Sequence, residues 1–413
     1  MRWTRLSPVL ALLVSSLPLA CGSAESSSKE GDTSSVNQPA EGSMPFQPVA
    51  NPPKLVIDPN EDGSTDEQLK IAMSMTGAKR FTVIPESGYP KELTDRIANS
   101  STEDAAKFVG LVTGKGHYML EVDSLALVEK FRHLGGKAEA GSTDPRGWSN
   151  AVDNRARITG AANIPIQQGK VSGSGGCSGA LIGRRIMRTA AHCVISNNTS
   201  GGTPVGSVSY WTRRDEGAFY ASDTTSAFFY GGNYIPTGCA TQIGSNAWAG
   251  YSNNLDACLW ADWSLVILTD NWYSEGGAGI SWWGYRMLGT ADLGLDLTSY
   301  GYPGCDDSST SENSIAEDPA GCFGHSNAFY RDQSTRCEVG AWLSGTARWR
   351  VGCDVSPGNS GGPVIQRGSG YVIGHAQWQD CGTCTAGNNY PNRYLGHDQW
   401  LFDFQNQLRN TYP

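Results

Sequence analysis

Short apolar runs separated by glycine, asparagine and proline constrain the fold most, and they fill the chain from Asp153 onward. Such runs, bounded by turn-forming residues, are typical of strands in a barrel or sandwich. The composition agrees, because 51 glycines and only 17% charged residues favour a loop-rich β protein over a helical one. Residues 398–409 instead repeat apolar side chains at helical spacing and predict a closing helix. The runs expected to form strands are 179–182, 185–189, 207–211, 263–268, 297–300 and 371–374.

Cysteine usage indicates the compartment. Ten of the 11 cysteines lie between Cys177 and Cys384, while Cys21 stands apart. An even set of ten predicts disulfides and an oxidising compartment. Zinc ligation is the alternative, but only Cys381 and Cys384 have metal-like spacing and no second pair matches them, so no metal is expected. The net charge of -9 argues against a nucleic-acid partner, which usually requires a basic face.

Residues 1–21 have the form of an export signal. Arg2 and Arg5 precede an apolar run, Leu6 to Ala20, that is too short to span a bilayer. The Leu-Pro-Leu-Ala end of that run, directly before Cys21, resembles a bacterial lipobox, in which the signal is removed and the cysteine is lipidated. This predicts a bacterial cell-envelope lipoprotein, or a protein secreted after processing, that meets a membrane only through a lipid on Cys21. Ordinary signal cleavage without lipidation is the alternative.

Two segments of different character follow the signal. Residues 22–53 are rich in Ser, Pro, Gly and Glu and predict a disordered tether. Residues 54–150 lack cysteine and predict a small α/β segment. Its start, 58–66, resembles an EF-hand calcium loop, but Leu69 stands where the closing glutamate is needed, so a solvated linker is expected. The expected elements are a strand at 81–84 and helices at 92–98, 102–109 and 123–134.

The run Ser356-Pro-Gly-Asn-Ser-Gly-Gly-Pro-Val364 suits a nucleophilic serine on a tight turn. Glycine tolerates dihedral angles that other residues cannot adopt, and it lets a substrate carbonyl approach the backbone. The amides of Gly358 and Ser360 could then point at the oxyanion of an acyl-transfer intermediate. The alternative is an ordinary Gly/Ser/Pro surface loop.

Two further residues complete a catalytic set. His192 follows a strand-like run and two small alanines, and a bridge between Cys177 and Cys193 would stiffen its loop. Histidine suits a general base because its pKa lies near neutrality. Asp262 stands at the head of an apolar run, where a buried carboxylate needs hydrogen bonds, and it could orient the imidazole.

These motifs carry a family resemblance over residues 153–410. Thr189-Ala-Ala-His-Cys193, Asp262-Trp-Ser-Leu-Val-Ile and Gly358-Asn-Ser-Gly-Gly-Pro363, in the order His, Asp, Ser, resemble the chymotrypsin-fold serine peptidases. The specific likeness is to the bacterial V8-like, or glutamyl endopeptidase, branch, supported by 153–158 and 300–304. The resemblance implies a mostly β fold of two antiparallel six-stranded barrels with a C-terminal helix. It also implies that Ser360, His192 and Asp262 are catalytic.

Two departures from the family are visible. Asn359 replaces the aspartate that pairs with the new N-terminal amine in the animal enzymes, so activation here is not expected to use that ion pair. The cysteines also outnumber those of typical V8-like members. By sequence proximity, the expected disulfides are Cys177–Cys193, Cys239–Cys258, Cys305–Cys322 and Cys337–Cys353.

Specificity stays open between acidic and basic substrates. Asp354 lies six residues before Ser360, at the offset where trypsin-like enzymes carry the acid that binds Arg or Lys, but V8-like members also have an aspartate there. His375 is the candidate for binding acidic side chains, although it is shifted by about one position, which on a strand turns a side chain to the other face. The candidate substrate-binding residues are Asp354, His375 and Gln377. His117, His133, His325 and His397 are expected to be structural or surface residues.

The sequence therefore predicts an exported serine endopeptidase made as a zymogen. Residues 1–21 are the lipoprotein-type signal peptide, 22–53 the linker, 54–150 the pro-segment and 151–413 the peptidase domain. Cleavage is expected in the Gly/Ser/Thr-rich segment 141–152, and residues 54–140 are expected to occlude the active site before it. The expected partners are protein or peptide substrates of a monomeric enzyme without a cofactor. A catalytically silent homologue acting as a surface binding module is the alternative.

Overall fold

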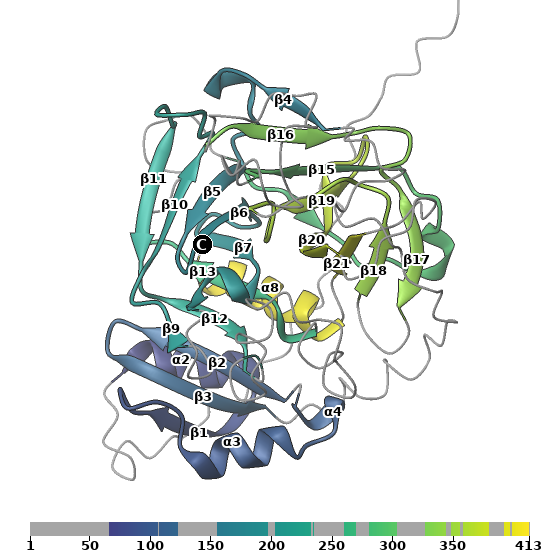
Figure 1. Ribbon diagram of the computed structural model, residues 1–413. Helices are drawn as coiled ribbons and strands as arrows, with labels where there is room; N and C mark the ends of the chain where they lie inside the picture. Colours follow the sequence, from purple (N-terminus) through teal and green to yellow (C-terminus); the bar gives the residue numbers. More distant parts are fainter. Residues whose placement is uncertain are drawn as a thin grey trace, which may run out of the picture. The chain divides into compact units, whose positions relative to one another are not determined.

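The computed structural model describes most of the chain from Asp66 to Tyr412, and Figure 1 shows the arrangement of its elements. The export signal, Cys21, the tether and the helix expected at 123–134 lie outside the described residues. Within the described part, no helix is long and apolar enough to cross a membrane. The described residues are 66–105, 107–122, 155–196, 203–232, 234, 260–269, 281–303, 327–343, 348–355, 358–379, 392–396 and 399–412.

The N-terminal segment is a small α/β unit, as its sequence predicts. The expected strand at 81–84 and helix at 92–98 are confirmed. The helix expected over 102–109 is wrong in its second half, because Phe108 begins a strand whose residues are all buried and paired on both sides. Tertiary pairing here overrides the helical spacing. The elements are α2 (Glu67–Thr76), β1 (Ala78–Ile84), α3 (Lys91–Ala98), α4 (Thr102–Ala105), β2 (Phe108–Thr113) and β3 (Gly116–Val122).

Helix α2 was not expected from the sequence, and its N-cap explains it. The Asp66 carboxylate accepts hydrogen bonds from the backbone N–H groups of Gln68 and Leu69, at 3.0 and 3.4 Å, and from the Thr113 hydroxyl. A capped first turn of this kind stabilises a helix by about 1 kcal/mol. The aspartate that ends the calcium-loop-like run therefore serves as a helix cap.

The first large sheet combines this unit with the first half of the peptidase segment. Its strand order is β1-β3-β2-β12-β13-β7-β6-β5-β10-β11. Strand β2 pairs antiparallel with β12, from Val112 opposite Phe228 to Val109 opposite Gly231. Ten strands thus share one sheet: three come from the N-terminal unit and seven from the peptidase segment, for which the resemblance implied a six-stranded barrel. The strands from the peptidase segment are β5 (Gln168–Ser172), β6 (Gly176–Leu181), β7 (Ile186–Thr189), β10 (Val208–Thr212), β11 (Ala221–Thr225), β12 (Phe228–Gly231) and β13 (Ser264–Ile267).

The second sheet is built from the rest of the peptidase segment. Its order is β17-β18-β21-β20-β19-β15-β16-β4, and β14 pairs with β20 in parallel. A short pair, β8 (Ile195–Ser196) with β9 (Thr203–Pro204), lies apart from both sheets. The strands are β4 (Ala156–Ile158), β14 (Gly284–Tyr285), β15 (Leu297–Gly301), β16 (Phe329–Asp332), β17 (Val339–Leu343), β18 (Arg348–Val351), β19 (Pro363–Gln366), β20 (Tyr371–Gln379) and β21 (Asn392–Gly396).

The predicted fold class, mostly β with antiparallel sheets and a C-terminal helix, is confirmed. All six predicted strand runs form strands, and the closing helix is α8 (Gln399–Thr411). Single 3-10 turns occur at Ala161–Asn163 (η2), Ala191–Cys193 (η3) and Thr290–Asp292 (η5).

Helix α8 packs against the first sheet through aromatic side chains. The Phe404 ring lies 5.1 Å from the Phe229 ring of β12, edge to face, and close to Trp263 and Trp400. The same apolar cluster includes Leu395 of β21 in the second sheet. Through these contacts, helix α8 joins the two sheets that together hold the site. Replacing Phe404 with alanine would lower the free energy of unfolding by about 3–5 kcal/mol.

Candidate active site

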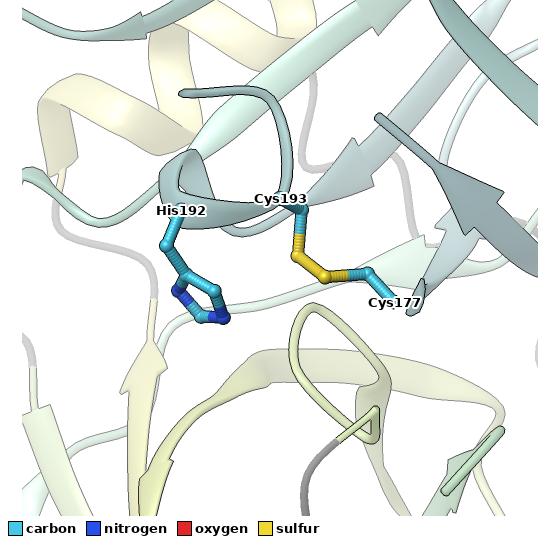
Figure 2. A group of neighbouring side chains, drawn as sticks. All are labelled: Cys177, His192 and Cys193. Carbon is cyan, nitrogen blue, oxygen red and sulfur yellow. A yellow bond between two sulfur atoms is a disulfide. The ribbon is translucent and has the colours of Figure 1, made fainter. Parts of the chain in front are cut away.

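His192 stands at the end of β7, in the 3-10 turn η3. Ala190 and Ala191, which precede it, are fully buried, and their small side chains let the turn pack closely. The Cys177–Cys193 disulfide ties this turn to β6. Figure 2 shows the His192 ring beside that disulfide. The ring is therefore anchored by a strand on one side and by a covalent bridge on the other.

His192 and Asp262 form a close pair. The His192 Nδ1 atom lies 3.0 and 2.9 Å from the two carboxylate oxygens of Asp262, and the backbone N–H of His192 donates to Oδ1 at 2.9 Å. The carboxylate is fully buried, whereas the imidazole keeps 12% of its side-chain surface exposed. Since Nδ1–H donates to the carboxylate, the lone pair of the neutral ring is on Nε2, the nitrogen that a general base uses.

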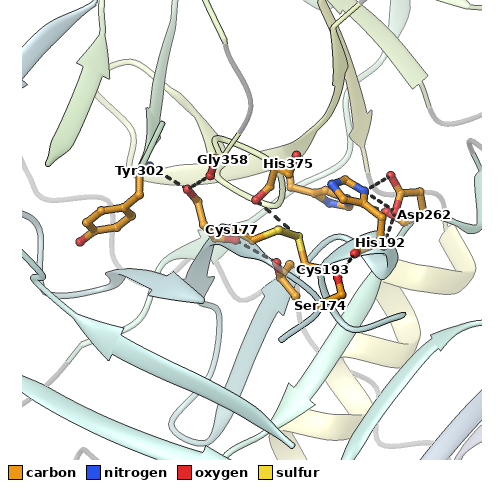
Figure 3. Close-up of a disulfide and its surroundings, with 11 residues drawn as sticks. Ser174, Cys177, His192, Cys193, Asp262, Tyr302, Gly358 and His375 are labelled. Atoms are coloured by element: carbon orange, nitrogen blue, oxygen red, sulfur yellow. Dashed lines mark hydrogen bonds and ion pairs between the residues drawn. A yellow bond between two sulfur atoms is a disulfide. The ribbon is translucent and has the colours of Figure 1, made fainter. Parts of the chain in front are cut away.

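The loop that carries Ser360 packs against the strand and turn that carry His192. The Ser360 carbonyl oxygen accepts the backbone N–H of Ser178 at 2.8 Å, and the Cys193 sulfur lies 3.7 Å from the same oxygen. The Ser178 hydroxyl donates to the Gly358 carbonyl at 2.7 Å and accepts the Tyr302 N–H at 2.8 Å. Figure 3 shows these bonds around Tyr302, Gly358 and the disulfide. The backbone of Ser360 is thus held next to Cys193, the residue that follows His192.

Two glycines in this loop are required by its geometry. Gly358 and Gly361 have φ values of +92° and +77°, which L side chains rarely adopt. A Cβ on Gly361 would lie 2.1 Å from the Thr189 hydroxyl oxygen and 2.4 Å from the Ser178 carbonyl oxygen. The glycines flanking Ser360 therefore set the turn and allow its approach to β7, as the sequence motif indicated.

Comparison with known proteins gives one sequence match. No family model matches the sequence. Trypsin 5G1 of Aedes aegypti is 34% identical over 79 residues, which are 17% of this chain and 30% of that protein. The chain is similar to chymotrypsin-fold serine peptidases. The match spans about a third of the curated relative.

Similar solved structures include two peptidases. A Glu endopeptidase in complex with MPD has a TM-score of 0.43 and 16% identity, over 63% of this chain and 98% of that chain. The protease Anisep from Arthrobacter nicotinovorans has a TM-score of 0.38 and 17% identity, over 62% and 99%. Neither similarity bears on catalysis or substrate choice.

The residues considered for substrate binding are all buried. His375 is 1% exposed, and both of its ring nitrogens are bonded within the protein, to Arg188 and to the Asp262 carbonyl. This corrects the expectation that His375 binds acidic side chains, since no ring nitrogen is left for a substrate. The one-residue shift has turned the ring inward. Gln377, at 3% exposure, is also buried in this strand.

Asp354 lies three residues beyond the end of β18, a strand of the second sheet. It is fully buried, and its backbone N–H donates to the Asp332 carboxylate at 2.7 Å. Burial raises the pKa of the nearby Tyr394 hydroxyl, and the charges of Asp332, Asp354 and Arg155 all act on that hydroxyl. Arg155 is itself buried and stacks over Tyr330. The acid at the trypsin-like offset therefore shares its surroundings with a second carboxylate and a guanidinium of the protein's own.

Two of the expected disulfides, Cys177–Cys193 and Cys337–Cys353, are confirmed. The other two expected pairs, Cys239–Cys258 and Cys305–Cys322, lie outside the described residues. In the described part of the chain, one group of three side chains has metal-ligand spacing: Cys177, His192 and Cys193. Its two sulfurs are joined in a disulfide and are not thiolates, so we assign no metal there.

Sequence reasoning missed Ser178 and Arg188. Ser178 stands between Cys177 and Gly179 on β6 and carries no motif of its own. Arg188 did carry a signal, because it is a charged residue inside an apolar run, Ile186–Thr189, that leads directly to His192. A buried arginine in such a strand requires partners, and these partners lie in the other sheet.

Proposed function

We propose that the protein is a serine endopeptidase in which Ser360 is the nucleophile, His192 the general base and Asp262 the residue that orients His192. The observation that carries the proposal is the contact of both Asp262 carboxylate oxygens with His192 Nδ1. The packing of the Ser360 loop against Cys193 and Ser178 supports it.

The chemistry follows from the protonation state of His192. Nε2 takes the proton of the Ser360 hydroxyl as the oxygen attacks the peptide carbonyl, and Asp262 stabilises the imidazolium that forms. The amides of Gly358 and Ser360 stabilise the oxyanion, an interaction worth about 3–4 kcal/mol per donor in related chemistry. The imidazolium then protonates the leaving amine. Water, deprotonated by His192, hydrolyses the acyl-enzyme, and no cofactor is required.

Fluorophosphonate labelling tests the nucleophile. We expect the protein to react at Ser360 and to lose both labelling and peptide cleavage in Ser360→Ala. Ser369→Ala is the matched control, because Ser369 lies in the next turn and its hydroxyl bonds only locally, donating to the Gln366 carbonyl at 3.2 Å and accepting from the Tyr371 N–H at 3.3 Å. A folded protein that is neither labelled nor able to cleave peptides would instead be the silent binding module.

Export, lipidation and zymogen processing belong to the same proposal. Residues 1–21 direct export, Cys21 carries a lipid, and a cut at 141–152 breaks the chain between the pro-segment and the peptidase domain. Mass spectrometry of the protein from a bacterial envelope fraction tests the first two, and Cys21→Ala should release it from the membrane. Comparing activity before and after the cut tests inhibition by residues 54–140; equal activity would exclude it.

His375 and Asp354 are both buried, so neither is offered as the residue that selects acidic or basic side chains. Cleavage of a peptide library, with the residue before each cut read by mass spectrometry, determines the preference directly.

A further inference from the structure

A buried arginine links the two sheets beside the His192–Asp262 pair. Arg188 lies on β7, four residues before His192, and is 1% exposed. Its Nε–H donates to His375 Nδ1 at 2.9 Å, and its Nη2 donates to the carbonyl oxygens of Leu395 and Gly396 at 3.1 and 3.0 Å. One side chain of the first sheet therefore bonds to both β20 and β21 of the second.

Arg188 fixes the tautomer of His375. A guanidinium is always a donor, so His375 Nδ1 must accept and Nε2 must carry the ring proton. That Nε2–H donates to the backbone carbonyl of Asp262 at 2.9 Å. In Figure 3, His375 lies beside Asp262 and His192. Burial, with the Arg188 charge adding to it, lowers the pKa of His375 well below its usual value, so the ring stays neutral.

Burying Arg188 and His375 costs folding free energy, so stability by itself does not explain this arrangement. Burying an arginine and a histidine requires their full desolvation, and apolar side chains of similar volume often fill such a space at no loss of stability. Unlike apolar side chains, the polar pair makes directional hydrogen bonds. It restrains the backbone carbonyl of Asp262, whose carboxylate holds His192, and its arginine comes from β7, the strand that leads to His192.

We propose that Arg188 and His375 are positioning residues that hold the Asp262 backbone so that its carboxylate meets His192 Nδ1. The inference rests on the proposed peptidase function. It adds a buried relay, Arg188 to His375 to Asp262, through which the second sheet sets the geometry of a pair that belongs to the first.

The decisive comparison is His375→Phe with His375→Gln. Phenylalanine fills the space and cannot donate, whereas a glutamine amide can accept from Arg188 and donate to the Asp262 carbonyl. We expect kcat to fall by about tenfold to a hundredfold in His375→Phe, as for an error of about 1 Å in catalytic geometry, with KM changed less than about twofold. His375→Gln should recover most of that loss.

A spectroscopic readout separates positioning from general destabilisation. The Nδ1 proton of His192, bonded to Asp262, gives a far-downfield proton NMR signal that we expect to shift or vanish in His375→Phe and persist in His375→Gln. Tyr394→Phe is the control, because it removes a buried hydrogen bond to Ser299, 2.7 Å long, in the same sheet. It should leave the signal and kcat unchanged.

The outcomes decide the proposal in each case. An unchanged signal and a kcat within twofold of wild type in His375→Phe would overturn it. If that variant does not fold, Arg188→Lys replaces it, since one ammonium cannot reach His375 and both carbonyls together, and the same signal is followed. If wild-type protein cleaves no peptide, the peptidase proposal fails while the NMR comparison still decides whether Arg188 and His375 position Asp262.

A second observation, independent of catalysis, concerns the pro-segment. All six residues of β2 are buried, and the strand is paired with β3 on one edge and with β12 on the other. The packing between β2 and β12 is close. A Cβ on Gly110 would lie 2.0 Å from the Tyr230 ring, and one on Gly232 would lie 2.5 Å from the Phe108 backbone.

A polar cluster spans the same junction. His117 Nε2 lies 2.6 Å from the Tyr230 hydroxyl and 3.1 Å from the Tyr89 hydroxyl, and the two hydroxyls are bonded to each other. Tyr89 and His117 come from the pro-segment and Tyr230 from β12. Separating the two parts would expose the apolar strand β12 and leave the edge of β12 without its ladder partner.

From this junction we infer that residues 66–122 stay bound to the peptidase domain after a cut at 141–152. The edge of β12 is their binding surface, and the partner is an antiparallel strand of the same chain. The pro-segment then remains part of the active protein and is not released after cleavage.

The test is made on the full chain with a site-specific protease sequence placed within 141–152. After cutting, we expect both fragments to co-elute in gel filtration without denaturant and to separate in urea. Gly110→Val should weaken this association, whereas Gly114→Val should not, because a Cβ on Gly114 meets nothing within 4 Å. Separation of the wild-type fragments without denaturant would overturn the inference, whether or not Gly110→Val folds.

Discussion

Gly361 packs against Thr189 so closely that a Cβ at position 361 would lie 2.1 Å from the Thr189 hydroxyl oxygen. That hydroxyl is itself fixed, since it donates to the Ser178 carbonyl at 2.8 Å. Moving Gly361 away from the Thr189 hydroxyl would break the contact between the Ser360 loop and the strand that leads to His192. The residue after the proposed nucleophile is therefore part of the alignment of the site.

We expect Gly361→Ala to reduce peptide cleavage by at least about a hundredfold, as an error of about 1 Å in catalytic geometry does. Gly368→Ala is the matched control. Its φ of +81° is close to the +77° of Gly361, but nothing lies within 4 Å of its Cβ position. Both variants carry similar backbone strain, but only an alanine at position 361 meets Thr189. Under conditions where both variants are folded, only Gly361→Ala should therefore lose activity. Equal losses in the two variants would show that strain, not the contact with Thr189, is responsible.

Asp262→Asn should leave the fold intact and reduce kcat on the order of 10⁴-fold. An asparagine that donates to Nδ1 selects the wrong tautomer of His192, with the proton on Nε2, as in related triads. The measurement is kcat at saturating peptide, with circular dichroism as the fold control. An effect under tenfold would mean that the contacts of 2.9 and 3.0 Å between this pair are not used in catalysis.

The two described disulfides allow a matched comparison. Each joins cysteines 16 residues apart: Cys177–Cys193 links β6 to the His192 turn, and Cys337–Cys353 lies just outside the ends of β17 and β18. Replacing either pair by alanine should lower the free energy of unfolding by about 3 kcal/mol, the value for loops of this length. Only the Cys177/Cys193 double variant should also lower kcat at a temperature where both proteins are folded, because that bridge carries the His192 turn. Equal kcat in the two variants would contradict this role.

The local structural settings of the proposed catalytic residues could be predicted from the sequence, whereas their long-range surroundings could not. The glycines around Ser360, the alanines before His192 and the apolar run after Asp262 are local patterns, so their strand and turn settings could be read without a fold. His375 could not be placed that way, because a shift of one residue on β20 decides whether its ring faces a substrate or Asp262.

Long-range pairing explains the other differences. The helix expected over 102–109 gives way to β2 because β12, more than a hundred residues later, offers a strand edge to Phe108–Thr113. Nothing near residue 108 in the sequence announces that partner. Arg188 is similar: its charge was visible in an apolar run, but its partners on β20 and β21 are separated from it by about two hundred residues.

The last prediction concerns the stability of the pro-segment junction in acid. Burial lowers the pKa of His117 to about 4, below the usual 6.5, so the unfolded chain binds its proton first. The free energy of unfolding should therefore fall as pH drops from about 6.5 to about 4, by at most about 1.4 kcal/mol per pH unit for this group. His375 titrates in the same direction, so the measurement compares denaturant unfolding of wild type with His117→Gln. Glutamine can still bond Tyr89 and Tyr230 but does not titrate, and equal slopes in both proteins would contradict the assignment to His117.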